Sequence, residues 1–482
     1  MTRSPRVIIV GAGVAGIATG VALRDAGFHD FRIIEKADDV GGVWQWNRYP
    51  GLSCDVPSQI YQFSFATKPD WPRVFATQPQ IQGYMCDVVD DNGLREHLTL
   101  GTEVRAARFD GTGWEVTTDA GTERCDFLIC ATGILHHPNV PDISGRDEFE
   151  GDVVHTARWD PETETAGRRI AVVGNGSTGV QVATALQPVA EQLTLYSRSP
   201  QWVIGAPTDA TQPRALTWAL RSDAVARVAY RAGLASSGLL VDVVTKPTWR
   251  RRAVQSLARR HLERLRDPVL RERLRPDYEP LCKRQVVSGG FHRAIQQPNV
   301  EVLRQGIDRF TPAGLVASDG HERAHDLVIL ATGFKAHNYM RPMQLVGRDG
   351  ITIEDQWRDG PSAYRMTAIP GFPNLFTVLG PNSPIGSLSQ HWAAELTGAY
   401  IAAWMRRWAV GAFDTVEVTQ AATDAFNSQV RQAMPSTVWA TGCDSWYLTE
   451  SGNVDLWPFN GRTMSRMLST PDPADFTLAG PA

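Results

Sequence analysis

Two glycine-rich motifs of the same pattern are the residues of this chain best suited to chemistry. The first, GAGVAG at Gly11–Gly16, has glycines at its first, third and sixth positions, and Glu35 lies 19 residues after it. Glycines at this spacing let backbone N–H groups approach a pyrophosphate at a helix N-terminus, and a carboxylate at this distance can accept hydrogen bonds from a ribose diol. The pattern predicts a dinucleotide site built from Gly11, Gly13, Gly16 and Glu35.

The second motif differs from the first in the charge that follows it. It reads GNGSTG at Gly174–Gly179, and the residue 19 positions later is Arg198. A guanidinium at this place can bind a 2′-phosphate, whereas the carboxylate of Glu35 would repel one. The first site therefore suits FAD and the second suits NADPH. The predicted NADPH ligands are Gly174, Gly176, Ser177, Thr178, Gly179 and Arg198.

An aromatic segment follows the first motif, where a flavoprotein chain runs beside the isoalloxazine ring. It reads GGVWQWNRYPGLSCD at Gly41–Asp55. Paired glycines permit close approach and aromatic side chains can pack on a flat ring, so Gly42, Trp44 and Tyr49 are predicted to contact FAD. Burial in the protein core is an equal alternative for Trp44. Asp55 is the only acid of the segment, and a place in a surface turn is its alternative.

Two adjacent cations, Lys283 and Arg284, end the segment YEPLCKR at Tyr278–Arg284. Neighbouring side chains of an extended chain point opposite ways, so one can face the NADPH phosphate while the other faces the flavin. Ordinary surface charge is the alternative for both. A further segment, FEGDVVHTARWD at Phe149–Asp160, comes just before the second dinucleotide unit and is expected to link two domains.

The hydrophobic pattern places each glycine motif between two buried strands, which defines a β-α-β unit. The two units lie 163 residues apart, so each heads its own domain. We expect an α/β fold with two Rossmann-like dinucleotide-binding domains. The expected elements are strands at 6–10, 31–35, 168–173 and 193–198, and helices at 13–26 and 176–186.

The NADPH domain is expected to be nested within the FAD domain. The segments CDFLICATG and HDLVILATG each read as a buried strand and a turn, and the chain is expected to leave the first domain near Pro141 and to return near Asp326. Arginine and helix-forming residues at 206–280 predict a helical insertion. The predicted parts are an FAD-binding domain at 1–145, an NADPH-binding domain at 146–325, and the rest of the FAD domain at 326–482 with a loosely ordered tail after Thr470.

Composition and charge favour a cytoplasmic protein. The formal net charge of the 482 residues is −4, which offers no general attraction to nucleic acid or to an anionic membrane. Outside the first dinucleotide unit, no stretch is apolar and uncharged over the ~20 residues that a membrane-spanning helix needs, so stable membrane insertion is not expected. The six cysteines show neither zinc spacing nor a secreted disulfide framework, so we expect no metal site and a reducing compartment.

These motifs together resemble those of the type I Baeyer–Villiger monooxygenases, within the flavin-containing monooxygenase superfamily. The residues from Phe149 to Asp160 fit every place of the family fingerprint F-x-G-x-x-x-H-x-x-x-W followed by Pro or Asp. The residues from Gly41 to Asp55 fit a second family pattern. The wider superfamily usually has another aromatic residue in place of Trp159. The resemblance extends from about Arg6 to Trp457 and includes TGCDSWY at Thr441–Tyr447.

The resemblance implies a monooxygenase that uses FAD, NADPH and dioxygen. It would insert one oxygen atom beside the carbonyl of a small apolar substrate, through a peroxyflavin, and so give an ester or a lactone. Arg284 would stabilise the peroxyflavin anion, and Asp55 would pair with Arg284. The remaining implied assignments are NADPH binding for Lys283 and Arg198, and coupling of domain motion to catalysis for His155 and Trp159.

Other functions compete with this one. The main alternative is oxidation of a sulfur or nitrogen atom by a flavin hydroperoxide, against which Arg284 and Trp159 argue. A pyridine-nucleotide disulfide reductase also holds FAD and a nicotinamide. Cys125 and Cys130, however, lie an odd number of residues apart on one predicted strand, so their side chains should point to opposite faces. A flavin-binding regulator without catalysis is the third alternative, and turnover of NADPH would exclude it.

Overall fold

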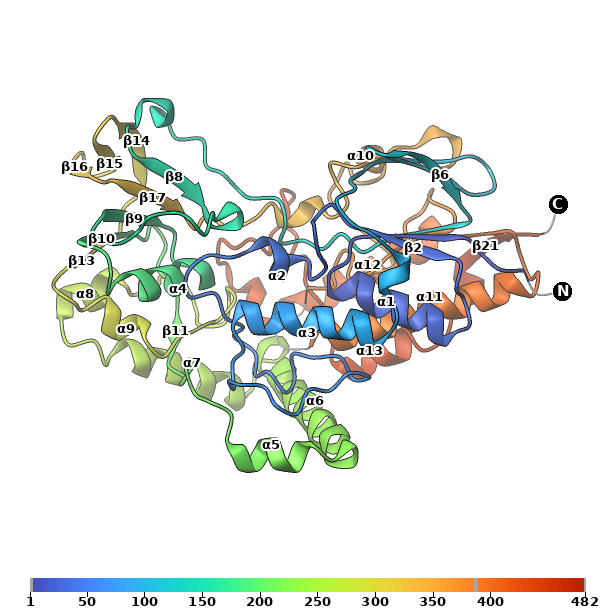
Figure 1. Cartoon of the computed structure of the whole chain (residues 1–482), viewed down its shortest axis with the longest axis horizontal. Coiled ribbons are helices and arrows are strands. Elements are labelled where there is room, and N and C mark those ends of the chain that lie inside the picture. The colour runs from blue at the N-terminus through green and yellow to red at the C-terminus, as the bar shows by residue number, and fades with distance from the viewer. Residues whose placement is uncertain (1–2, 385–388, 481–482) are drawn as a thin grey trace.

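The computed structural model describes residues 3–384 and 389–480, and these form two lobes, each built around a parallel sheet (Figure 1). The elements of the first sheet and its helix are β1 (Val7–Val10), α1 (Val14–Asp25), β2 (Phe31–Ile34), β3 (Leu98–Thr99), β7 (Phe127–Cys130) and β19 (Leu375–Thr377). The strand order is β19-β7-β1-β2-β3, and every pairing is parallel. The first glycine motif therefore follows a central strand and opens α1, as its spacing predicts.

The second sheet repeats the first. Its elements are β8 (Asp152–His155), β9 (Arg169–Val173), α4 (Ser177–Leu186), β10 (Gln192–Tyr196), β13 (Val300–Leu303) and β17 (Leu327–Leu330). The order is β13-β10-β9-β17-β8, again with parallel pairings. β17 lies beside β9 as β7 lies beside β1, so the two dinucleotide units have the same local topology.

The return to the first lobe comes later than residue 326, where the sequence pattern placed it. β17 pairs with both β9 and β8, so it is an internal strand of the second sheet and the chain crosses back only after Leu330. The two connections between the lobes run side by side. The backbone N–H of Lys335 donates to the carbonyl of His137 at 2.8 Å, and that of Asn139 donates to the carbonyl of Gly333 at 2.9 Å.

Smaller sheets extend both lobes. An additional sheet of the first lobe contains β4 (Val104–Phe109), β5 (Trp114–Thr118), β6 (Gly121–Cys125) and β18 (Gln344–Val346), and that of the second contains β14 (Ile307–Thr311), β15 (Gly314–Ala317) and β16 (Glu322–Ala324). A two-stranded pair joins β11 (Val203–Ile204) to β12 (Val286–Val287). Cys125 and Cys130 end β6 and β7, which belong to different sheets rather than to one strand, and both are free thiols.

The tail after Thr470 is ordered up to Gly480, which corrects the expectation of a loose tail. β21 (Phe476–Ala479) pairs antiparallel with β20 (Thr415–Val418). Just before β21, the carboxylate of Asp475 accepts hydrogen bonds from the side chains of Tyr364 and Arg365. The tail is held because it supplies both a strand partner and a buried apolar residue, Phe476.

The helical insertion is present and contacts both lobes. It contains α5 (Arg214–Leu220), α6 (Asp223–Thr245), α7 (Trp249–Leu262) and α8 (Pro268–Arg273). The end of α6 packs into the core of the first lobe through Val243 and Val244, whereas Ala258 and Leu262 of α7 belong to the core of the second. Arg251 donates to backbone carbonyls of Val243 at 2.9 Å and of Ser436 at 2.9 Å.

Most of the other helices belong to the first lobe, whereas α9 packs on α4 in the second. They are α2 (Val43–Trp46), α3 (Gln78–Asp91), α9 (Phe291–Ala294), α10 (Ile353–Gln356), α11 (Gln390–Ala409), α12 (Gln420–Ala433) and α13 (Gly461–Met467). α11 packs closely on α1, because Gly398 leaves room for the backbone of Thr19, which would lie 3.3 Å from an added Cβ. Among the helices of the described residues, none has the length and apolar character needed to cross a membrane.

Candidate active site

A single large cavity is lined by both glycine motifs. Its volume is about 1480 Å³, and the residues that follow β1, β7, β9 and β17 all contribute to its wall. Ligands of α/β sheets bind beyond the carboxyl ends of the strands, which is where these residues lie. Pockets for one small ligand usually have volumes of about 300–1,000 Å³. The size and the two motifs fit a site for two nucleotides.

The two glycine motifs have nearly the same geometry. Gly11 has φ +105° and an added Cβ would lie 2.6 Å from the carbonyl oxygen of Ala131. Gly174 has φ +104° and an added Cβ would lie 2.5 Å from the carbonyl oxygen of Ala331. The last glycine of each motif is equally crowded, since the Cβ position of Gly16 lies 1.8 Å from the carbonyl oxygen of Gly11. No side chain larger than glycine fits these places, so the sequence keeps both turns tight.

The helix N-termini behind the two motifs have N–H groups free to bind phosphate. Neither the residue before α1, Gly13, nor the residue before α4, Gly176, caps its helix with a side chain. Nothing lies within 4 Å of the Cβ position of Gly176, so this turn opens into the cavity, and Ser177 and Thr178 line the same wall. Uncapped N–H groups and the helix dipole favour an anion at such an end.

Glu35 is buried beside the first motif. Its carboxylate oxygens accept hydrogen bonds from the backbone N–H groups of Ala12 at 2.8 Å and Ala37 at 2.9 Å. Each carboxylate oxygen has a second lone pair, and Glu35 also lines the cavity, so it can accept hydrogen bonds from a ribose diol. The acid therefore holds the glycine turn and offers a ligand group at once.

Replacing Glu35 with alanine should lower the affinity of the protein for FAD. Hydrogen bonds to a charged group contribute roughly 1.5–3 kcal/mol each, so we expect FAD affinity to fall about tenfold or more. The ratio of flavin to protein absorbance after purification measures this loss. Glu96→Ala is the matched control, because the Glu96 side chain is 79% exposed. A full flavin complement in the Glu35 variant would contradict the assignment.

The aromatic segment packs directly on the first glycine motif. Gly42 has φ +56°, and its Cβ position lies 2.9 Å from the Cα of Gly13. Glycine at this position therefore lets the backbone of the aromatic segment approach the backbone of the first glycine motif. Trp44 is buried and donates through its indole N–H to the hydroxyl of Tyr61 at 2.9 Å, and both residues also line the cavity. Trp44 is therefore both a buried residue and a residue of the cavity wall.

Tyr49 has a contact that the sequence did not reveal. Its hydroxyl donates to the side-chain oxygen of Gln181 at 3.0 Å and lies 3.3 Å from that of Thr178, both on α4. Gln181 in turn donates to the carbonyl of Ser53 at 2.9 Å. Tyr49 lines the cavity, and its hydroxyl also connects the aromatic segment to α4 of the second lobe.

The cations expected at the second nucleotide lie on one side of the cavity. Arg198 follows β10, is exposed and lines the wall. The ammonium group of Lys283 donates to the hydroxyl of Ser199 at 2.9 Å and lies 4.6 Å from the ring centre of Tyr278. Burial lowers the pKa of Lys283, and the carboxylate of Asp444 opposes this effect. Arg198 and Lys283 are thus neighbours through Ser199, although 85 residues separate them.

Arg284 and Asp55, which both line the cavity, form an ion pair. The guanidinium donates to one carboxylate oxygen of Asp55 at 2.8 Å and to the other at 3.1 Å. The carboxylate raises the pKa of Arg284 above its ordinary value, which keeps the guanidinium charged. The Arg284 side chain is 43% exposed and that of Asp55 is 14% exposed, so the cation is the partner that faces the open cavity.

The linking segment at Phe149–Asp160 lies at the edge of the second sheet. An added Cβ at Gly151 would lie 2.6 Å from the ring of Phe149, so glycine makes room for that ring. His155 ends β8, and its Nδ1 accepts a hydrogen bond from the N–H of Ala157 at 3.0 Å. Burial lowers the pKa of His155 to about 4. The buried side chains of His155 and Trp159 fix the chain where it leaves β8.

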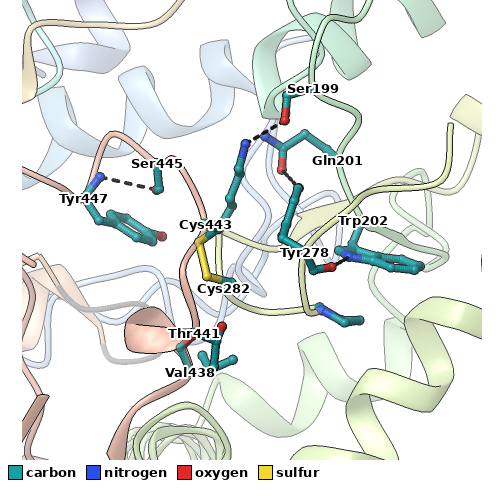
Figure 2. Close-up of a disulfide and its surroundings, with 12 residues drawn as sticks. Ser199, Gln201, Trp202, Tyr278, Cys282, Val438, Thr441, Cys443, Ser445 and Tyr447 are labelled. Carbon is teal, nitrogen blue, oxygen red and sulfur yellow. Dashed lines mark hydrogen bonds between the residues drawn. A yellow bond between two sulfur atoms is a disulfide. The ribbon is translucent and has the colours of Figure 1, made fainter. Parts of the chain in front are cut away.

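A disulfide joins Cys282 to Cys443, which the cysteine pattern did not predict (Figure 2). The cysteines form this one disulfide rather than a framework, and Cys54, Cys86, Cys125 and Cys130 are free thiols. Each bonded cysteine falls inside a motif segment, YEPLCKR or TGCDSWY, but neither segment indicates the pairing. Among the described residues, no group of three or more histidine, cysteine or acidic side chains is arranged to hold a metal ion.

Comparisons with known proteins show which proteins this chain resembles. A family model described as pyridine nucleotide-disulphide oxidoreductase matches residues 8–215, which include both glycine motifs. An uncharacterised monooxygenase of Mycobacterium tuberculosis is 47% identical over 99% of this chain and 96% of its own length. A Baeyer–Villiger monooxygenase of Streptomyces coelicolor is 38% identical over 99% of this chain and 93% of its own length. The closed crystal structure of cyclohexanone monooxygenase matches with a TM-score of 0.89 and 28% identity, covering 100% of both chains.

The two linked dinucleotide units and these relatives define the protein as a flavoprotein monooxygenase. The Streptomyces enzyme, which is similar over nearly the whole of both chains, is a Baeyer–Villiger monooxygenase. The chain belongs to the type I Baeyer–Villiger monooxygenase family.

Proposed function

We propose that this chain binds FAD and NADPH and inserts one oxygen atom of dioxygen beside the carbonyl of a small apolar ketone, giving an ester or a lactone. The observation that carries the proposal is the Arg284–Asp55 ion pair on the wall of the cavity that both glycine motifs line. When bound, NADPH supplies hydride and FAD supplies the activation of dioxygen. The residues described above supply binding, orientation and charge.

Arg284 would provide a permanent cation on the cavity wall, where it would stabilise the negative charge that develops during oxygen transfer. A guanidinium cannot give up its proton in a protein, so its charge does not depend on the state of the reaction. A cation that is already in place costs no reorganisation when this negative charge develops. Asp55 accepts hydrogen bonds from Nη2 of Arg284 at 2.8 Å and from its Nε at 3.3 Å, and this two-point contact fixes the orientation of the planar group.

The residues of the second nucleotide site supply coenzyme choice. Arg198 and Lys283 are positive groups on the cavity wall, where a 2′-phosphate would give each a partner. The relation of this chain to a structure determined with FAD and NADP, at 26% identity and a TM-score of 0.88, supports the same pair of cofactors.

A turnover screen tests the proposal. The purified protein would be incubated with NADPH, ¹⁸O-labelled dioxygen and a panel of ketones, and products would be identified by mass. We expect esters or lactones that carry one labelled oxygen atom. A matched panel of sulfides tests the alternative chemistry, since labelled sulfoxides without any ester would point to heteroatom oxidation instead.

Asp55→Ala should slow the enzyme without removing its flavin. The variant leaves Arg284 without its partner, and a misplaced catalytic group can cost up to about a hundredfold in rate. We expect flavin reduction and oxygenation each to slow by about tenfold or more, measured by stopped-flow absorbance. Asp55→Asn keeps the shape of the side chain and should retain part of the rate. Wild-type rates for both steps in Asp55→Ala would show that Asp55 is only a turn residue.

A further inference from the structure

The Cys282–Cys443 disulfide joins two segments that both end at the cavity. The cysteines are 161 residues apart in the sequence, and their side chains are buried. Lys283 and Arg284 follow Cys282 directly, and residues 444–447, here called the C-terminal wall segment, follow Cys443. All these residues line the main cavity. Figure 2 shows Ser445 and Tyr447 on one side of the bond and Tyr278 on the other.

Among the described residues, backbone hydrogen bonds hold the end of the C-terminal wall segment but not its start. Neither cysteine lies in a helix or a strand. Leu281, just before Cys282, has φ +77°, a conformation that a leucine rarely adopts and that its surroundings must impose. Within the part of the chain that the structure describes, residues 442–446 donate no backbone hydrogen bond to another backbone group. The end of the C-terminal wall segment is held by the backbone N–H of Asp455, which donates to the carbonyl of Tyr447 at 2.8 Å, and by burial of the Tyr447 ring. The covalent bond is therefore a restraint mainly on the start of this segment, beside Cys443.

The charges of the two segments also act on one another. The carboxylate of Asp444 favours the charged form of Lys283, whose pKa burial lowers. The guanidinium of Arg284 acts in the same way on the phenol of Tyr447, opposing the rise in its pKa that burial causes. Movement of the C-terminal wall segment would remove both interactions from the nucleotide side of the cavity.

We propose that Cys282–Cys443 is a redox-sensitive positioning site that couples NADPH oxidation to oxygen transfer. With the bond formed, the start of the C-terminal wall segment is held in place as part of the cavity wall beside Lys283 and Arg284. With the bond reduced, the start of the segment moves away from Lys283, water enters, and dioxygen takes up the reducing equivalents and is released as hydrogen peroxide. This inference rests on the proposed function. The reduced protein keeps its fold, because each lobe has its own buried core and Asp55 still holds Arg284.

The bond can be opened by a dithiol and closed by a peroxide. A thiolate of the dithiol attacks the sulfur of Cys443, the sulfur of Cys282 leaves and takes a proton, and the second thiolate then displaces Cys443. The products are two protein thiols and one cyclic disulfide. In the reverse direction hydrogen peroxide oxidises one thiol to a sulfenic acid with release of water, and the other thiol displaces a second water. Cys443 borders a second cavity of about 920 Å³, which is the side from which we expect a dithiol to approach the bond.

The test compares oxidised and reduced wild-type protein under otherwise identical conditions. Alkylation after denaturation should count four free thiols in the oxidised protein and six after treatment with dithiothreitol. The ratio of hydrogen peroxide to oxygenated product should rise roughly tenfold on reduction, since a displacement of about 1 Å can cost a hundredfold in rate. Hydrogen exchange of the amides at 441–447 should become faster in the same sample. This second readout does not depend on turnover.

Single variants distinguish the effect of breaking the Cys282–Cys443 bond from effects of dithiothreitol on the other thiols. Cys443→Ser should behave like the reduced wild type and should no longer respond to dithiothreitol. Cys86→Ser removes a free, half-buried thiol and should respond as the wild type does. Bound flavin in every sample shows that the protein is folded.

The outcomes distinguish this inference from the proposed function. Six free thiols in protein purified without reductant would overturn the inference, as would an unchanged peroxide ratio in a sample with proven reduction. If no ketone yields product in any state, the proposed function fails. In that case unchanged exchange at 441–447 on reduction would overturn the positioning role independently, and faster exchange would support it.

Discussion

Arg284→Ala is expected to convert the enzyme into an NADPH oxidase that releases hydrogen peroxide. The variant should fold, bind FAD and be reduced by NADPH, because Arg284 lies in neither core and contacts neither glycine motif. Removing one preorganised charge partner costs about 3–4 kcal/mol of transition-state stabilisation, which is on the order of a hundred- to a thousandfold. The structure adds a second effect, since Asp55 would then present an unpaired negative charge to the cavity.

Product and peroxide assays on a ketone that the wild type oxidises measure this effect. Arg284→Lys keeps the charge but loses the planar two-point contact with Asp55, so it should recover little activity. Arg260→Ala removes an exposed arginine of α7 and should leave both yields unchanged. Near-normal ester formation by Arg284→Ala would defeat the proposed role of Arg284.

The dinucleotide units were predictable because their sequence signals are local. The positions of Gly11 and Gly174 have a positive φ and lie against a neighbouring carbonyl oxygen, so only glycine fits them. This requirement can be recognised in the sequence itself. The charge contrast between Glu35 and Arg198 is likewise tied to a fixed distance from each motif. The elements around these residues lie within a few residues of the expected ranges.

The features that the sequence did not reveal depend on contacts between distant segments. β17 reads as a buried strand in either lobe, and only its pairing with β8 and β9 decides between them. The hydroxyl of Tyr49 reaches Gln181 across 132 residues, so an aromatic residue expected at the flavin also joins the lobes. Cys282 and Cys443 have no motif spacing, because the fold rather than the local chain brings them together.

Arg198→Ala should remove most of the preference for NADPH over NADH. Arg198 has the same offset from its motif as Glu35, and the stem of its side chain runs beside Gly306, whose Cβ position lies 3.9 Å from the arginine Cδ. This contact with the loop after β13 leaves the guanidinium at the rim of the cavity, where a 2′-phosphate can reach it. A charge-assisted hydrogen bond contributes roughly 1.5–3 kcal/mol, so NADPH affinity should fall about ten- to a hundredfold while NADH affinity stays nearly constant.

Steady-state kinetics with NADPH and with NADH measure this preference as the ratio of the two kcat/KM values. Lys283→Ala should have a smaller effect, because part of its role is to bond Ser199 and its charge is shared with Asp444. The double variant should lose more than either single one, since both cations would face the same phosphate. Arg231→Ala removes an exposed arginine of α6 and serves as the control. An unchanged NADPH/NADH ratio in Arg198→Ala would refute the assignment, and the 2′-phosphate site would then have to lie elsewhere on the cavity wall.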